Sequence, residues 1–357
     1  MADLTPALQE LFARQHGVAT SAQLIKRGLS ERRIATATRR GQFSRLHRGA
    51  YAVAERWARA EPRARHCLRL LATQLAAPDA IGIACTAATV WGWPVRHLPE
   101  LPVVAREPGL GSRFAGATVR RVSVEVYEVA HRHGLTITSR ERTVLNVVAE
   151  SEFTDALITV DAAFREGVTP RSVMKGVGGG KAVRRRRRIM RVLEAGDPAS
   201  ESALESMSRG CMIVSELPLP LCNVVLICNG LVYRVDFLWV ELGVVGECDG
   251  KVKYRNPGDV TEVLWQEKRR HEQIEEWTFR VARWGYPEAV NGGESMIRRI
   301  RQAIAAQQRL GFAWPSGVRA EVRTPRGATS PPHVAAEVAR LQRLGYPIKL
   351  LGDGAQW

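Results

Sequence analysis

Apolar positions in the first fifty residues recur at helical spacing and are interrupted by single glycines. Leu8, Leu11 and Phe12 fall on one face of the first segment, as the buried side of an amphipathic helix would. Helices are expected over residues 5–16, 22–27 and 31–40. Ser30 is placed to cap the third helix, and residues 42–53 then alternate as two short strands. Three helices followed by a hairpin predict a winged helix-turn-helix domain over the first 55 residues.

The pattern between residues 56 and 195 is mixed. Core helices are expected over residues 68–75 and 144–163, and strands over residues 119–129. No combination of side chains in this segment indicates a chemical site. Five consecutive arginines at residues 184–188 form either a solvated charge run or a basic surface that follows a phosphate backbone, and both interpretations stay open. We therefore expect a mixed α/β middle domain that ends in a basic linker.

A third domain is expected over residues 196–311. Its predicted elements are a helix at 201–212, strands at 222–228, 231–240 and 244–248, a helix at 261–277, a strand at 279–284 and a closing helix at 294–310. Asn229 and Gly230 give the strongest short hairpin signal in the chain. The core order is αβββαβ, and the fold class of the whole chain is multidomain α/β. Residues 312–357 are expected to be a linker and tail with one short helix at 333–344.

Composition and charge indicate that the protein binds a polyanion. The chain has 357 residues and a net charge of +16, and its isoelectric point is about 10.3. Residues 1–50 hold nine Lys and Arg against three Asp and Glu, whereas residues 201–311 hold fourteen against fifteen. A basic excess of this size is typical of proteins that neutralise phosphates. A solubilising surface or the arginine bias of a GC-rich genome would also produce it.

Nothing in the sequence indicates a membrane or a secreted protein. The longest apolar runs are too short to span a bilayer, and the first residues lack the basic and apolar segments of a secretory signal. The six cysteines show neither a CxxC pair nor framework spacing, so we expect reduced thiols. These features predict a cytoplasmic protein, while its oligomeric state is left open.

The basic residues of the first domain are the candidate DNA contacts. The third helix would be the recognition helix in the major groove, and the hairpin would be the wing. The arginines expected to contact double-stranded DNA are Arg32, Arg33, Arg39 and Arg40 on the helix, with Arg45 and Arg48 on the wing. An arginine-rich helical bundle that binds nothing is the alternative interpretation.

The string GVATSAQLIKRGLSERRIATATRRGQFSRLHRGAYAV resembles the N-terminal winged-helix domain of AbiEi-type antitoxins. The segments IGIACTAATVWGWPV and TSRERTVLNVVAES also resemble this family, so the likeness covers roughly the first half of the chain. The family's winged helix binds the promoter of its own toxin–antitoxin operon. The resemblance therefore implies promoter DNA and a cognate toxin as partners.

Carboxylates in the C-terminal domain are the candidate metal ligands. Asp236 interrupts the apolar strand YRVDFLW, and Glu247 and Asp249 lie two residues apart at the end of the next strand. Glu205 on the first helix can approach them from the side. Acids converging in a buried strand pair repel one another unless they are satisfied. A bound Mg²⁺ or Mn²⁺ would relieve this cost, and it could activate water for phosphodiester hydrolysis.

The segments LESMSR, RVDFLWVELGVVGECDGKVKY, LWQEKRRHEQ and FRVARW resemble the Vsr-like branch of PD-(D/E)XK nucleases, with the restriction-endonuclease-like fold. The resemblance implies that Asp236, Glu247 and Asp249 bind metal or water and that Glu205 is the helix carboxylate. Asp249 replaces the usual lysine two residues after the glutamate. The resemblance implies that a catalytic lysine comes from elsewhere. Lys253 and Lys268 are the catalytic lysines that the resemblance suggests, and Lys251 is a further candidate.

Two functions fit these patterns. One is a metal-dependent endonuclease that a winged helix delivers to DNA, in phage defence or in a toxin–antitoxin context. The other is an antitoxin-like transcriptional repressor whose nuclease-type domain is inert. RNA as the substrate is a third interpretation, although the winged helix favours duplex DNA.

Overall fold

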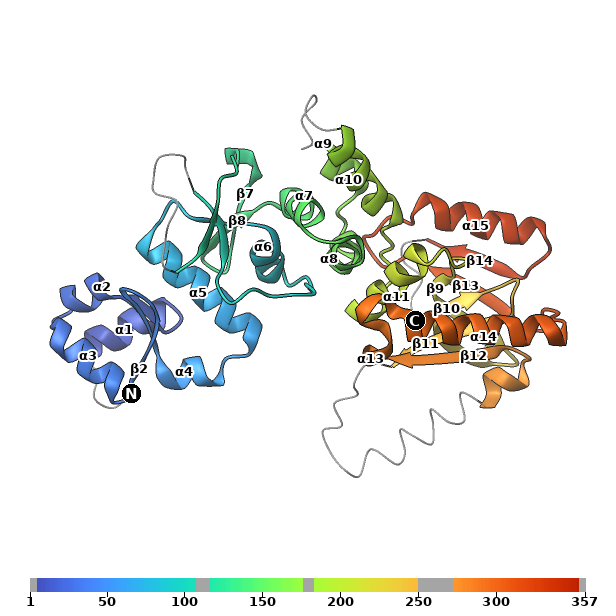
Figure 1. The fold of residues 1–357 in the computed structure, drawn as a ribbon, viewed down its shortest axis with the longest axis horizontal. Coiled ribbons are helices and arrows are strands. Elements are labelled where there is room, and N and C mark those ends of the chain that lie inside the picture. The colour runs from blue at the N-terminus through green and yellow to red at the C-terminus, as the bar shows by residue number, and fades with distance from the viewer. Residues whose placement is uncertain (1–4, 107–115, 176–182, 250–271, 353–357) are drawn as a thin grey trace. The chain divides into compact units, whose positions relative to one another are not determined.

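The computed structural model describes residues 5–106, 116–175, 183–249 and 272–352, and Figure 1 shows their helices and strands. Contacts divide the chain into two units, Met1–Glu150 and Ser151–Trp357. The structure contains three β-sheets of three, five and six strands. No helix in the described ranges combines the length and the apolar character that crossing a membrane requires.

The first unit begins with the predicted three helices and a hairpin. In order they are α1 (Pro6–Arg14), β1 (Val18–Thr20), α2 (Ser21–Lys26), α3 (Glu31–Arg39), β2 (Phe43–His47) and β3 (Ala50–Val53). The three strands form a sheet in the order β1-β3-β2. Leu8, Leu11 and Phe12 of α1 are buried, as predicted, and pack with Leu24 and Ile34 of the next two helices.

The remainder of the first unit is a five-stranded sheet with helices around it. Its elements are α4 (Ala54–Arg59), α5 (Pro62–Ala76), β4 (Ile81–Gly82), α6 (Ala84–Trp91), β5 (Val103–Ala105), β6 (Thr118–Arg120), η1 (Val126–Glu128), β7 (Val129–Arg132), β8 (Leu135–Thr138) and α7 (Arg140–Glu150). Helix α5 joins the two sheets, because Ala72 packs against Val18 and Ala52 of the winged helix while Leu70 packs against Ile137 of the larger sheet.

The second unit is built on the six-stranded sheet, whose order is β12-β11-β10-β9-β13-β14. Its elements are α8 (Phe153–Arg165), α9 (Pro170–Lys175), α10 (Val183–Ala195), α11 (Ala203–Val214), β9 (Leu221–Cys228), β10 (Leu231–Trp239), β11 (Val244–Asp249), β12 (Arg280–Gly285), α13 (Tyr286–Ala289), η2 (Asn291–Gly293), α14 (Glu294–Leu310), β13 (Arg319–Arg323), α15 (Pro332–Arg343) and β14 (Ile348–Leu351). Strands β9, β10 and β11 are antiparallel neighbours, and β12 runs parallel to β11. The predicted order of strands is therefore present. Of the helix expected at 261–277, the described part is helical over residues 272–276.

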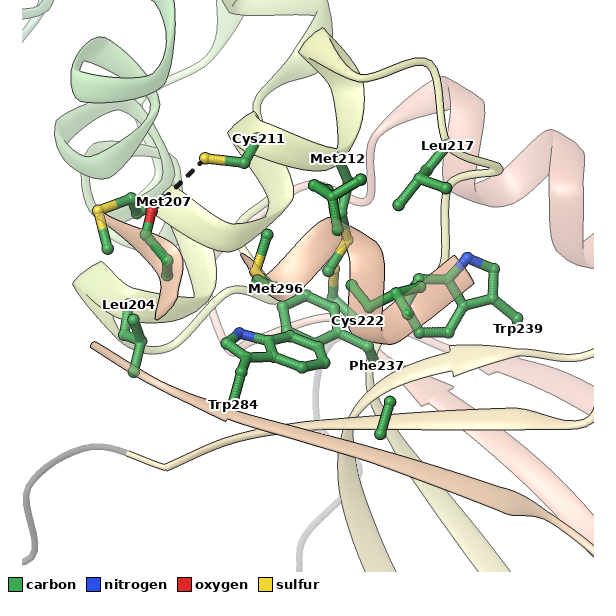
Figure 2. Close-up of a cluster of buried hydrophobic side chains, with 14 of the residues drawn as sticks. Leu204, Met207, Cys211, Met212, Leu217, Cys222, Phe237, Trp239, Trp284 and Met296 are labelled. Carbon is green, nitrogen blue, oxygen red and sulfur yellow. Dashed lines mark hydrogen bonds between the residues drawn. The ribbon is translucent and has the colours of Figure 1, made fainter. Parts of the chain in front are cut away.

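An apolar cluster of buried side chains covers each face of this sheet. Helices α11 and α14 cover one face, where the rings of Phe237 and Trp284 stack at 5.6 Å between centroids, as Figure 2 shows. The indole Nε1 of Trp284 donates to Ser208 Oγ of α11 at 2.9 Å, so the helix is tied to the sheet by a buried hydrogen bond. Val334 and Val338 of α15 pack on the other face.

Two expectations about individual elements need correction. The expected linker contains β13, which pairs with β9 and is extended by β14, because Val318, Ala320 and Val322 alternate into the core. The single helix expected at 144–163 is two helices, α7 and α8, separated by residues 151–152.

The chain also divides at residues 150 and 151, whereas we expected boundaries near residues 55, 195 and 311. The physical reason is that α8 packs on α11. Asp161 of α8 accepts two hydrogen bonds from Arg209 Nη2 of α11, both of 2.8 Å, and both side chains are buried. Residues 153–195 therefore belong with the C-terminal sheet.

Candidate functional sites

Helices α2 and α3 and the turn between them present the basic residues of the winged helix. Thr20 Oγ1 accepts from Gln23 N at 3.2 Å, and Gln23 Oε1 accepts from Thr20 N at 3.0 Å, so α2 begins in a capping box. Ser30 Oγ accepts from Arg33 N at 3.3 Å and caps α3 as predicted. Gly28, at φ +92°, provides the left-handed residue that the turn between the helices requires.

The buried face of α3 fixes the orientation of this helix, since Ile34 and Ala37 pack against α1 and β2. The six arginines predicted to contact DNA are all exposed: Arg32, Arg33, Arg39 and Arg40 at α3, and Arg45 and Arg48 at the hairpin. In the described part of the chain none of these six forms an ion pair with a carboxylate. Two of them make long side-chain hydrogen bonds: Arg39 donates to Thr36 Oγ1 at 3.3 Å, and Arg45 donates to the backbone oxygen of His47 at 3.4 Å. Glu31 in the first turn of α3 is also exposed, but it forms no ion pair with these arginines within the described ranges, so their positive charge is not paired with an acid.

Three carboxylates of the second unit, those of Glu205, Asp236 and Glu247, lie near the middle of β9 and β10. Glu205, in the first turn of α11, is buried. Its Oε2 accepts from the backbone N–H of Glu201 at 2.8 Å and from Asn223 Nδ2 at 2.6 Å. Asn223 Nδ2 also donates to the carbonyl of Ala199 at 2.6 Å. Asn223 Oδ1 is buried and has no hydrogen-bond partner among the described residues, so one polar atom at this site stays unsatisfied.

The sheet is irregular at this point. Asn223 has a left-handed backbone, at φ +48°, and lies opposite Asp236 in the β9–β10 register. In a regular strand Cys222 and Val224 would face the same side. Here they pack in the opposite clusters, so the alternation of β9 reverses at Asn223. The reversal places a polar pair in the centre of an apolar sheet.

Strands β10 and β11 separate next to this pair. Their paired register ends at Phe237 and Gly246, while β11 continues beside β12 as far as Asp249. The carboxylate of Asp236 then takes the place of a backbone acceptor, because its Oδ2 accepts from Cys248 N at 2.8 Å. Asp236 is consequently half-buried with one oxygen committed to the strand that follows.

The carboxylates influence one another through this gap. Burial raises the pKa of Glu205, and the neighbouring charge of Asp236 adds to the rise. Burial, followed by the charges of Asp236 and Glu205, also raises the pKa of the Cys248 thiol. Glu247 is 6% exposed, whereas Asp249 is exposed at the end of β11. Glu205, Asp236 and Glu247 therefore share one electrostatic environment, and Cys248 is a neutral thiol within it.

The predicted metal centre can be compared with the described residues alone. In the described ranges no three His, Cys, Asp or Glu side chains are placed to hold one metal ion. Glu205 and Asp236 are instead tied to neighbouring N–H groups, and Asp249 is at the exposed strand end. The described residues alone do not fit a complete Mg²⁺ site. The predicted Lys253 and Lys268, together with Lys251, lie outside the described residues.

Asn223 is the residue of this site that sequence reasoning did not identify. It is a polar residue in the middle of a strand that is otherwise buried along nearly its whole length. A buried amide in such a strand needs partners of its own, and this requirement was the available signal. The sequence carries no sign of its left-handed backbone.

Comparisons with known proteins match the first helices and the hairpin. A family model described as "Transcriptional regulator, AbiEi antitoxin" matches residues 6–54. The chain is also 28% identical over 210 residues to the uncharacterized proteins MT2308 and Rv2248 of Mycobacterium tuberculosis, from strains CDC 1551 / Oshkosh and ATCC 25618 / H37Rv. Each alignment covers 55% of this chain and 72% of the relative.

Among solved structures, the RV2827C protein from Mycobacterium tuberculosis aligns with 60% of this chain and 83% of its own, at 14% identity and a TM-score of 0.38. That likeness is too distant to support an argument. The sequence match and the predicted winged helix agree on the same residues. Residues 6–54 are therefore similar to a transcriptional-regulator domain of the AbiEi antitoxin type.

Proposed function

We propose that this protein is a DNA-binding transcriptional regulator whose α3 enters the major groove while the β2–β3 hairpin contacts the flanking backbone. The observation that supports the proposal is the row of exposed arginines on a capped helix whose opposite face is buried, none of them in an ion pair within the described ranges. Four of them lie on α3 or at its C-terminal end, where a recognition helix presents side chains to base edges and to the flanking phosphates. The match of residues 6–54 to an antitoxin regulator supports the same assignment.

The antitoxin resemblance also suggests which DNA is regulated and which protein is the partner. The regulated DNA would be the region upstream of the protein's own gene, and a cognate toxin would be the protein partner. A regulator of this kind acts in the cytoplasm, where the DNA lies.

Footprinting on that upstream DNA tests the proposal. Wild-type protein is expected to protect a discrete duplex segment, and Arg33→Ala or Arg39→Ala is expected to weaken the protection. Each change removes one exposed guanidinium and leaves the buried Ile34 and Ala37 in place. Arg14→Ala is the matched control, since Arg14 is an exposed helical arginine that is paired with Glu10 at 2.6 Å. Absence of a footprint, or equal loss with Arg14→Ala, would refute the proposed surface.

A second candidate function is a metal-dependent endonuclease in the second unit, with a restriction-endonuclease-like core. The specific observation that favours it is the separation of β10 and β11 at Asp236, beside Glu205 and Glu247. The unsatisfied Asn223 Oδ1 adds an oxygen that could accept a ligand there. Mg²⁺ or Mn²⁺ would supply Lewis-acid chemistry on a phosphodiester, and Asp236, Glu247 and Asp249 are the residues proposed to hold it. The described residues do not complete such a site, so no catalytic step is assigned.

Plasmid incubation with Mg²⁺ or Mn²⁺ tests the second candidate. Nicking by the wild-type protein that is lost in Asp236→Ala would support it. Intact plasmid under all metal conditions, or equal cutting by the variant, would reject the nuclease and leave the regulator proposal unaffected.

A further inference from the structure

A large cavity lies within the first unit, where the winged helix meets the helices that follow it. Its volume is about 1040 Å³, and its walls come from α1, α4, α5, α6 and β8. This volume is at the upper end of the range for small-molecule sites, which is roughly 300–1,000 Å³. The apolar part of the wall includes Phe12, Leu68, Leu71, Val90 and Leu135. The cavity is therefore large enough for a molecule with a sizeable apolar body.

The rim of this cavity carries positive charge. Arg56 and Arg59, one turn apart on α4, line it together with His16 and His133. The one acid in the lining, Glu55, is paired with Arg59 at 3.0 Å. Arg56 forms no ion pair within the described ranges. An apolar wall below a cationic rim is complementary to a molecule with an apolar body and one anionic group.

The helix that carries these arginines is held in place by contacts that do not involve the cavity. Arg65 of α5 donates to the carbonyl oxygens of Trp57 and Ala58, at 3.0 and 2.8 Å, and so satisfies the end of α4. The guanidinium groups of Arg65 and Arg69 also lie over the Trp57 ring, at 5.5 and 5.3 Å from its centroid. The α4–α5 corner is therefore a preformed wall.

Two further observations concern the cavity wall itself. A Cβ on Gly17 would lie 2.7 Å from Arg56 Cδ, so the absence of a side chain at this position lets the Arg56 stem cross the backbone of the winged helix. Burial raises the pKa of the Cys67 thiol, so this lining residue is uncharged at neutral pH. The interior of the wall is apolar and neutral, and its charge is confined to the rim.

From these features we infer that the cavity is a binding site for an amphipathic carboxylate, with its apolar chain against α5, α6 and β8 and its carboxylate at Arg56. The inference does not depend on DNA binding. Because the walls belong both to the winged helix and to the helices that follow, an occupant would contact both parts of the unit.

Isothermal titration of the full-length protein with decanoate tests this site, and decylammonium serves as the probe of equal length and opposite charge. Saturable binding of decanoate to one site per chain is expected, with no saturable heat from decylammonium. Arg56→Gln should weaken decanoate binding by about ten-fold, the loss of one charge-assisted contact. Arg63→Gln is the matched control, because Arg63 is an exposed arginine of α5 that does not line the cavity.

A steric variant separates a binding site from general charge attraction. Ala64 lines the cavity from α5 and is exposed to it, so Ala64→Trp should occupy part of the volume without disturbing the core. Decanoate binding should then fall by at least the factor seen for Arg56→Gln, while circular dichroism stays that of the wild type. No saturable decanoate binding, equal binding of both probes, or wild-type affinity in a folded Ala64→Trp protein would overturn the inference.

Discussion

Single buried side chains connect segments of this protein that are far apart in the sequence. Asp161 is 0% and Arg209 4% exposed, and they are joined by paired hydrogen bonds of 2.8 Å. Burial raises the pKa of the Asp161 carboxyl, and the charge of Arg209 works against that rise. Asp161 also accepts from the backbone N–H of Asp197 at 2.8 Å, so α8, α11 and the segment before α11 meet at one carboxylate.

Replacing Asp161 should therefore destabilise the second unit strongly. Asp161→Asn would remove the carboxylate that pairs with the buried guanidinium of Arg209, although the charge of Asp197 still acts on it, and breaking such a buried pair costs about 3–5 kcal/mol. The expected result is a fall of the urea midpoint in the transition that belongs to the second unit. The control is Glu10→Gln, which breaks a pair exposed by more than half at both partners and should cost less than about 1 kcal/mol. Equal effects of the two changes would contradict the importance assigned to this pair.

His66 gives the first unit a pH dependence with a definite sign. Burial lowers the pKa of His66 to about 4, and its Nε2 lies 2.9 Å from Thr86 Oγ1. Between this value and the ordinary histidine pKa of about 6.5, the unfolded chain binds a proton that the folded unit does not. Stability should therefore be complete above pH 6.5 and should decrease as the pH falls towards about 4.

Urea denaturation across this pH range measures the effect. His66→Gln should flatten the part of the profile between pH 6.5 and about 4, because the replacement amide does not titrate. The change His131→Gln, at an exposed position, should leave the profile as it is. A profile that is already flat in the wild type would contradict the role of His66.

At the scale of elements, the sequence predicts best where local chemistry determines the structure. The caps at Thr20 and Ser30 and the glycine turns fix the helices of the winged helix, so these were predictable from a few neighbouring residues. Likewise Asn229 and Gly230, both with positive φ, close the β9–β10 hairpin. These signals depend on neighbouring residues and can therefore be recognised in a single sequence.

Features that depend on distant partners were missed. Strand β13 is five residues long and is flanked by Pro and Gly, so its alternation is outweighed by loop signals until its partner β9 is known. The joining of α8 to the C-terminal sheet depends on residues 48 positions apart. Asn223 is similar, because its backbone and amide contacts arise only when β9, β10 and α11 are packed together.

Strand β13 also leads to a prediction about the C-terminal segment. Val322 is 2% exposed and lies in the apolar cluster beneath α15. Val322→Asp would bury an unpaired carboxylate there, at a cost of several kcal/mol, and should unfold or strongly destabilise the second unit. Arg319→Asp, at an exposed position of the same strand, is the control and should be nearly neutral. Thermal unfolding followed by circular dichroism distinguishes them, and a tolerant Val322→Asp protein would mean that β13 is dispensable to the sheet.

The whole molecule combines a basic first unit with a second unit whose carboxylates lie at a break in its sheet. The exposed arginines of α3 and the hairpin lie in the first unit, and the domain match supports DNA as their partner. The acidic site lies in the second unit, and its described residues do not form a complete metal centre. DNA binding by the winged helix is therefore the central claim, and nuclease chemistry in the second unit is a separate question.

The salt dependence of DNA affinity tests that central claim most directly. For wild-type protein on its upstream duplex, log Kobs should fall linearly with log salt concentration, as expected when bound phosphates release counterions. Removing two guanidinium groups in the Arg33→Ala, Arg39→Ala double variant should lower affinity and reduce the slope by up to about 2, since each phosphate contact contributes about 0.9. DNA binding through α3 predicts this smaller slope for the double variant, and it predicts the wild-type slope and affinity for Arg14→Ala. A double variant with the wild-type slope and affinity would contradict it.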